Sequence, residues 1–180
     1  MIKVAITGAS GFIGQHVLNH LNNLPVEVVA TTRSKHTNLP KLVNGLWVEL
    51  DIQNPPENIF LLMGNPDILI HLAWQGLPNY KSLHHFELEL PAQYSFLSAL
   101  IKEGLRSVVV VGTCFEYGMQ NESLSEKLDT KPSNPYGFAK DCLRKQLEFL
   151  KMQYNFKLTW ARLFYLYGDG QSDSSIYQQL

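Results

Sequence analysis

The sequence predicts an α/β protein with one doubly wound parallel sheet, and three observations support this fold class. Short β-branched runs alternate along the chain with segments of helical periodicity. Some runs, such as the four consecutive valines at 108–111, are apolar on both faces, as is typical of strands covered by helices on both sides. The 180 residues are 45% hydrophobic and 17% charged, which suits one domain with a substantial core and excludes a second full domain.

Six strands are expected where β-branched and apolar residues cluster. In chain order they cover residues 3–6, 26–31, 46–50, 67–72, 107–111 and 158–162. Apolar residues spaced three or four apart indicate helices between several of these strands. The helical positions are Ile13, Val17, Leu18 and Leu21 after the first strand, Leu90, Tyr94, Leu97 and Ile101 before the fifth, and Leu143, Leu147 and Leu150 before the sixth.

Three glycines follow the first strand in the stretch ITGASGFIGQH, at positions 8, 11 and 14. Glycine is costly inside a helix or strand because it loses the most backbone freedom on folding. At the first strand-to-helix turn of a doubly wound sheet, glycines allow a tight turn and let a pyrophosphate approach the amino terminus of the helix. The GxxGxxG spacing differs from the usual GxGxxG, but its place indicates a nucleotide-binding turn; a merely structural turn is the alternative.

Tyr136 and Lys140 form a candidate acid/base pair. Asn134 is a suitable N-cap and Pro135 suits the first helical position, so the two side chains fall on one face of the first turns. A neighbouring ammonium favours a phenolate, so Lys140 is expected to lower the pKa of Tyr136 toward neutral pH. The alternative is an exposed aromatic ring beside a solvated lysine.

Charge and composition limit the partners. A formal net charge of −1 gives no electrostatic footprint for nucleic acid or an anionic membrane, and no apolar run approaches the length of a membrane-spanning helix. The start of the chain enters a strand pattern directly, so a cytoplasmic location is expected. Cys114 and Cys142 are too few for a disulfide framework, and the spaced pair His16 and His20 lacks a third ligand nearby, so no metal is expected.

Six motifs occur in an order that resembles the extended short-chain dehydrogenases/reductases. They are TGASGFIG at 7–14, DI at 51–52, HLAW at 71–74, GTCFEYG at 112–118, PYGFAK at 135–140 and ARLFYLYG at 161–168. Members of that family are NAD(P)-dependent epimerases, dehydratases and ketoreductases that act on nucleotide sugars. The resemblance implies a Rossmann-type domain over 1–180, a homodimer formed through helices near 83–103 and 136–154, and a carboxy-terminal substrate lobe. That lobe is expected to be largely missing after about residue 168, so the chain is expected to be a fragment of a longer one.

The resemblance also implies roles for individual residues. It gives Thr113, Tyr136 and Lys140 catalytic roles, with Tyr136 and Lys140 also near the cofactor. The remaining cofactor-binding positions are Gly8, Gly11, Phe12, Ile13, Gly14, Asp51, Ile52, Leu72, Ala73, Trp74 and Phe164. Simpler readings stay open: Thr113 as the cap of a strand end, Asp51 as a solvated loop acid, and Phe164 as part of an apolar strand exit.

The second strand bears on the choice of cofactor. Thr31 and Thr32 stand where an NAD site usually has an acid, and Arg33 could pair with the 2′-phosphate of NADP, so NADP is expected and NAD is the alternative. An exposed arginine without a ligand is the simpler reading.

The residues after Thr113 bear on the reaction. They are Cys114 and Phe115, where family 4,6-dehydratases carry Asp-Glu, so dehydration is disfavoured. We therefore expect NADPH-dependent reduction of a 4-keto-deoxysugar nucleotide. An NAD-dependent epimerase and a non-catalytic NADP-sensing protein are the alternatives.

Overall fold

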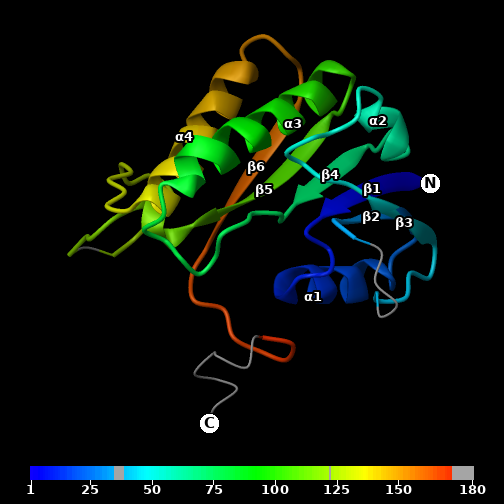
Figure 1. Cartoon of the computed structure of the whole chain (residues 1–180), viewed down its shortest axis with the longest axis horizontal. Coiled ribbons are helices and arrows are strands. Elements are labelled where there is room, and N and C mark those ends of the chain that lie inside the picture. The colour runs from blue at the N-terminus through cyan, green and yellow to red at the C-terminus, as the bar shows by residue number, and fades with distance from the viewer. Residues whose placement is uncertain (35–38, 122, 172–180) are drawn as a thin grey trace.

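The computed structural model describes residues 1–34, 39–121 and 123–171 of the chain. It contains one six-stranded sheet in the order β3-β2-β1-β4-β5-β6, and every neighbouring pair is parallel (Figure 1). The strands are β1 (Ile2–Thr7), β2 (Val26–Thr32), β3 (Gly45–Glu49), β4 (Ile68–His71), β5 (Ser107–Thr113) and β6 (Lys157–Leu163). The predicted doubly wound sheet is confirmed, with strand ends within two residues of those expected.

Helices cover both faces of the sheet (Figure 1). They are α1 (Phe12–Leu21), α2 (Ile59–Leu62), α3 (Leu90–Lys102) and α4 (Pro135–Leu150), with a π-helical turn η1 (His85–Glu89) that leads into α3 and a 3-10 turn η2 (Cys114–Glu116) after β5. The long helices begin where the caps and periodicities indicated. The sequence did not reveal α2, because one turn is too short to show a period, whereas η1 lies within the helix expected near 83–103 and only its π-helical form was not predicted.

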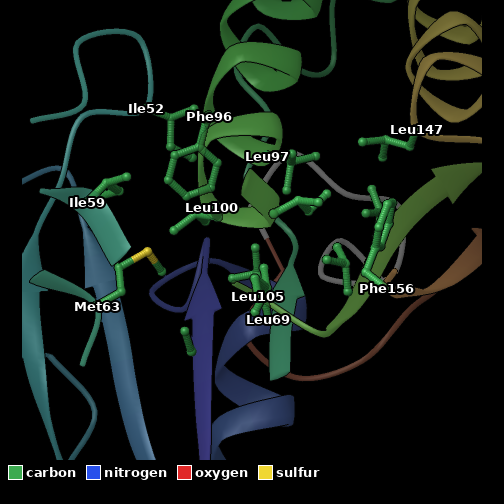
Figure 2. Packing of buried hydrophobic residues seen from close by; sticks show 14 of the residues in the cluster. Ile52, Ile59, Met63, Leu69, Phe96, Leu97, Leu100, Leu105, Leu147 and Phe156 are labelled. Carbon is green, nitrogen blue, oxygen red and sulfur yellow. The ribbon is translucent and has the colours of Figure 1, made fainter. Parts of the chain in front are cut away.

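The core is divided into two clusters by the sheet. Alternate residues of a strand point to opposite faces, so β1 places Ala5 on one side and Val4 and Ile6 on the other. The larger cluster packs Ala5, Leu69 and Val108 against α2, α3 and α4, with Phe96 and Leu100 fully buried between them (Figure 2). The smaller cluster packs the other face against α1. Burial on both faces explains why the strands read as continuous apolar runs.

The carboxyl ends of β1, β2, β4 and β5 meet at one edge of the sheet. The strand order reverses between β1 and β4, and this is where ligands bind in open α/β sheets. The strands end in polar side chains that are nevertheless buried, namely Thr7, Thr32, His71 and Thr113. This edge is therefore the place to look for a functional site.

Three expectations from the sequence extend beyond what the fold can decide. Within the described residues, no helix is long and apolar enough to cross a membrane; the cytoplasmic location stays a prediction. The homodimer also stays a prediction, although Phe138 and Phe149 leave an exposed apolar surface on α4. Most of the segment after about residue 168 lies outside the described residues, at 172–180, so the expectation of a fragment that lacks the substrate lobe stays a prediction.

Candidate cofactor and catalytic site

Different structural constraints act at the three glycines of the first turn. Gly8 has φ +70°, and a Cβ atom there would lie 2.8 Å from the backbone nitrogen of Ala73. A Cβ on Gly14 would lie 2.2 Å from the carbonyl oxygen of Gly8, so glycine lets α1 pack directly on the turn. Gly11 has φ −78°, and a Cβ there would meet only Gly8 O, at 3.3 Å. The protein itself requires Gly8 and Gly14, whereas Gly11 keeps open the space in front of α1.

The amino terminus of α1 has the features of an anion-binding site. Gly11 is the N-cap residue of this ten-residue helix, and no side chain caps it. The first N–H groups of a helix have no partner within the helix, and the helix dipole adds partial positive charge at this end. Together with the space at Gly11, these groups fit the pyrophosphate of a dinucleotide.

A first pocket extends from this turn across the ends of β2, β3 and β4. Seven of the residues expected to bind the cofactor line it: Gly8, Gly11, Arg33, Ile52, Leu72, Ala73 and Trp74. Arg33 is exposed, and its guanidinium donates a hydrogen bond of 3.0 Å to Gln75 Oε1, which also lines the pocket. The pocket therefore combines uncapped amides, apolar walls and one cation, as the adenosine half of a dinucleotide would need.

Asp51 is placed differently from Ile52. It is exposed at the rim, where its carboxylate accepts hydrogen bonds from Gln53 N and from Asn54 Nδ2, and it does not line the pocket. Phe12 and Gly14 do not line it either, and the Phe12 ring packs edge-on against His16. Asp51 thus shapes its own turn in this structure.

A second pocket holds the candidate catalytic residues. Thr113, Tyr136 and Lys140 line it together with Ile13 and Phe164, and it shares Leu72 and Trp74 with the first pocket. The two pockets are therefore adjacent along the same sheet edge.

Local structure brings Tyr136 to Thr113. The Asn134 side chain accepts a hydrogen bond from Gly137 N, so α4 begins as its sequence predicted, with Pro135 in the first turn. A Cβ on Gly137 would lie 2.6 Å from Phe115 O, so this glycine lets α4 lie close to η2. The result is that Tyr136 and Thr113 line the same pocket, close enough for Thr113 to act on the pKa of Tyr136.

The expectation that Lys140 lowers the pKa of Tyr136 is wrong for this structure. Burial raises the pKa of Tyr136 well above its ordinary value and Tyr80 raises it further, while the hydrogen bond with Thr113 acts in the opposite direction. Lys140 Nζ lies 6.0 Å from the centre of the Tyr136 ring, and it instead sits 4.0 Å from the centre of the Trp74 ring and donates to Val111 O. Desolvation lowers the pKa of Lys140 to about 7, so its charge is only partly present at neutral pH.

A buried polar chain under the first pocket was not anticipated. Thr7 Oγ1 donates to His71 Nδ1 over 2.8 Å, His71 Nε2 donates to Gln93 Oε1 over 2.7 Å, and Gln93 Nε2 donates to Glu89 Oε2. Burial, then the charge of Lys140, lowers the pKa of His71 to about 3, so this ring is neutral.

Glu89 anchors the wall of the first pocket. It is fully buried, and besides Gln93 it accepts from Gln53 Nε2 and Gln75 N, both residues of that wall. No role was predicted for Glu89 from the sequence, although its spacing of four from Gln93 places the two residues on one helical face. Among the described residues no three His, Cys, Asp or Glu side chains gather to hold a metal.

Comparisons with known proteins agree with this geometry. The family model "NAD dependent epimerase/dehydratase family" matches residues 4–180. A dTDP-6-deoxy-L-talose 4-dehydrogenase (NAD(+)) of Aggregatibacter actinomycetemcomitans is 30% identical over 99% of this chain and 67% of its own length. A GDP-6-deoxy-D-talose 4-dehydrogenase of the same organism is 27% identical over 79% of this chain and 46% of its own length.

Solved structures share the fold. The structure of MoeE5 in complex with UDP-glucuronic acid and NAD has a TM-score of 0.83 and 27% identity, and covers 98% of this chain. The UDP-glucuronic acid 4-epimerase of Bacillus cereus in complex with NAD has a TM-score of 0.80 at 22% identity. The chain spans 59% of the first of these structures and 61% of the second.

Proposed function

Because the chain belongs to the NAD dependent epimerase/dehydratase family, we propose that the whole protein is an NAD(P)-dependent oxidoreductase or epimerase that acts on a nucleotide sugar. The observation that carries this proposal is the continuity of the two pockets. The uncapped amino terminus of α1 opens one end of the site, and Thr113, Tyr136 and Lys140 lie at the other. The bound nicotinamide ring would supply hydride transfer, and the residues of this chain would supply the proton.

Tyr136 is suited to act as the proton donor. Its raised pKa keeps the phenol protonated at neutral pH, which is the form needed to give a proton to a carbonyl oxygen. The Thr113 hydroxyl, in the same pocket as Tyr136, would hold the same substrate oxygen and stabilise charge that develops on it. Lys140 would bind ribose hydroxyls and bring positive charge to the site.

Within this class we propose NADPH-dependent reduction of a 4-keto-deoxysugar nucleotide. Arg33 is exposed at the first pocket beside Thr31 and Thr32, where a 2′-phosphate would lie, and Cys114 and Phe115 provide no acid/base pair for elimination. The second candidate is an NAD-dependent dehydrogenase or epimerase. It is favoured by the printed names of three of the four similar proteins above, which include NAD, and by the hydrogen bond that already engages Arg33 with Gln75.

The choice between the two cofactors depends on Arg33. A guanidinium pairs bidentately with a phosphate and gains nothing comparable from a hydroxyl, a difference of about 1.5–3 kcal/mol. We therefore expect NADPH to bind roughly 10- to 100-fold more tightly than NADH, and Arg33→Ala to remove most of this gap by weakening NADPH alone. Titrations of both cofactors at one fixed salt concentration measure the gap, because salt screens exposed charges.

The matched control is Arg106→Ala, an exposed arginine just before β5 at the opposite edge of the sheet, which should change neither affinity. Equal affinities in the wild type, or tighter binding of NADH, would remove Arg33 from the site. That result would favour the NAD-dependent candidate.

A further inference from the structure

Glu116 is a buried carboxylate with no part in the mechanism above. It is completely inaccessible to solvent and lies in the short turn η2, three residues after Thr113. Its oxygens accept from Thr113 N at 2.8 Å, from Trp160 Nε1 at 3.0 Å and from Arg162 Nε at 2.6 Å. A buried carboxylate is costly unless it is paired and hydrogen-bonded, and this one has partners on both β5 and β6.

Gly112, which precedes Thr113, leaves the space that this carboxylate occupies. A Cβ on Gly112 would lie 2.4 Å from Glu116 Oε1 and 2.2 Å from Trp160 Nε1. The φ angle of Gly112 is not positive, so its backbone conformation does not require glycine. Gly112 is thus explained by the close approach of Glu116 and Trp160 to β5.

The bond from Thr113 N to Glu116 completes a reciprocal cap. Thr113 is extended, with φ −145° and ψ 149°, and its Oγ1 accepts a hydrogen bond from Phe115 N. Glu116 thus holds the Thr113 backbone and Phe115 N holds Thr113 Oγ1, at the pocket that Thr113 and Tyr136 line together. The orientation of Thr113 therefore depends on a carboxylate that touches neither pocket.

We propose that Glu116 is a positioning residue: its carboxylate, fixed by Trp160 and Arg162, holds the Thr113 backbone so that the Thr113 side chain is presented to the pocket that it shares with Tyr136. This inference rests on the proposed function, because it gives Thr113 and Tyr136 their catalytic roles.

The charge of Glu116 also acts on both catalytic neighbours. Burial lowers the pKa of Lys140. The charge of Glu116 opposes this shift, and the charge of Glu89 on η1 opposes it to a lesser extent. His71 on β4 also faces Lys140. Among the causes that raise the pKa of Tyr136, Glu116 follows burial and Tyr80. Arg162 on β6 is the cation that faces Glu116. Neutralising Glu116 should therefore move the pKa of Lys140 further down.

The test is Glu116→Gln, which keeps an acceptor but removes the charge and turns an amide toward Arg162. In the whole protein, kcat should fall roughly 10- to 100-fold, with KM and cofactor affinity within about twofold of wild type, because a small misplacement near the reacting atoms acts on turnover. In the 180-residue chain, a carbon-13 NMR titration of the Lys140 side chain should give a pKa below that of wild type. The matched control Asp141→Asn removes a buried carboxylate that is paired with Arg144 on α4, and it should change neither readout.

A milder variant covers the case in which Glu116→Gln does not fold. Trp160→Phe removes one donor to the carboxylate but leaves its charge and its bond to Thr113. It should lower kcat several-fold and leave the pKa of Lys140 unchanged.

A folded Glu116→Gln variant with wild-type kcat and wild-type Lys140 titration would overturn the proposal. If Glu116→Gln does not fold, Trp160→Phe with wild-type kcat would overturn it. If the whole wild-type protein turns over no nucleotide sugar, the proposed function fails. If Glu116→Gln leaves the pKa of Lys140 unchanged in the 180-residue chain, the proposed effect of the Glu116 charge on Lys140 is refuted, whatever the turnover of the whole protein.

Discussion

Tyr136→Phe is expected to lower the kcat of the whole protein by roughly 10²- to 10⁴-fold, with cofactor affinity within about twofold of wild type. The variant removes one hydroxyl and keeps the ring, which packs between Trp74, Tyr80 and His85. Because the ring contacts remain, the pocket should keep its shape and lose only the proton donor. Steady-state turnover of a nucleotide sugar, together with a cofactor titration, measures both quantities.

Tyr154→Phe is the matched control, since Tyr154 packs against the core beyond the end of α4 and away from both pockets. It should turn over like the wild type. Near-native turnover of Tyr136→Phe would show that the proton comes from another group.

Alanine at Gly11 and at Gly14 should produce opposite phenotypes. At Gly14 the new Cβ would lie 2.2 Å from the backbone oxygen of Gly8. This contact is with backbone and cannot be relieved by a rotamer change, so the free energy of unfolding should fall by about 3 kcal/mol. At Gly11 the new Cβ meets only Gly8 O at 3.3 Å, so the free energy of unfolding should change by about 1 kcal/mol or less.

Gly11→Ala should differ from the wild type in its affinity for the cofactor. The new methyl group would occupy the space in front of α1 where we place the pyrophosphate, so affinity should fall at least about tenfold in a protein that remains folded. Denaturant unfolding and cofactor titration of the same samples measure the two effects. Wild-type affinity in Gly11→Ala would mean that no ligand approaches this turn closely.

The fold was largely predictable because its signals are local. The strands are short runs rich in β-branched and apolar residues, and Asn134 and Pro135 identified the start of α4 correctly. The element that was missed, α2, is a single turn, and the π-helical form of η1 within the helix expected near 83–103 was not predicted. Sequence periodicity cannot resolve one turn.

The candidate site was only partly predictable, for a physical reason that Tyr136 illustrates. Helical spacing correctly placed Tyr136 and Lys140 near each other, but the pKa of Tyr136 is governed by burial among residues from other parts of the chain. Glu116 shows the same limit, because its partner Arg162 lies 46 residues away in sequence. Motifs report which residues gather at a site, whereas desolvation and long-range ion pairs require the tertiary structure.

The most direct test of this account is a titration of the 180-residue chain with NADH and NADPH, followed by energy transfer from tryptophan to the bound nicotinamide. Trp74 lines both pockets, so it lies beside the path proposed for the cofactor. We expect saturable transfer with at least one of the two cofactors, reduced strongly in Trp74→Phe and shifted to higher concentration in Gly11→Ala. A folded wild-type chain that shows no saturable transfer with either cofactor would contradict it.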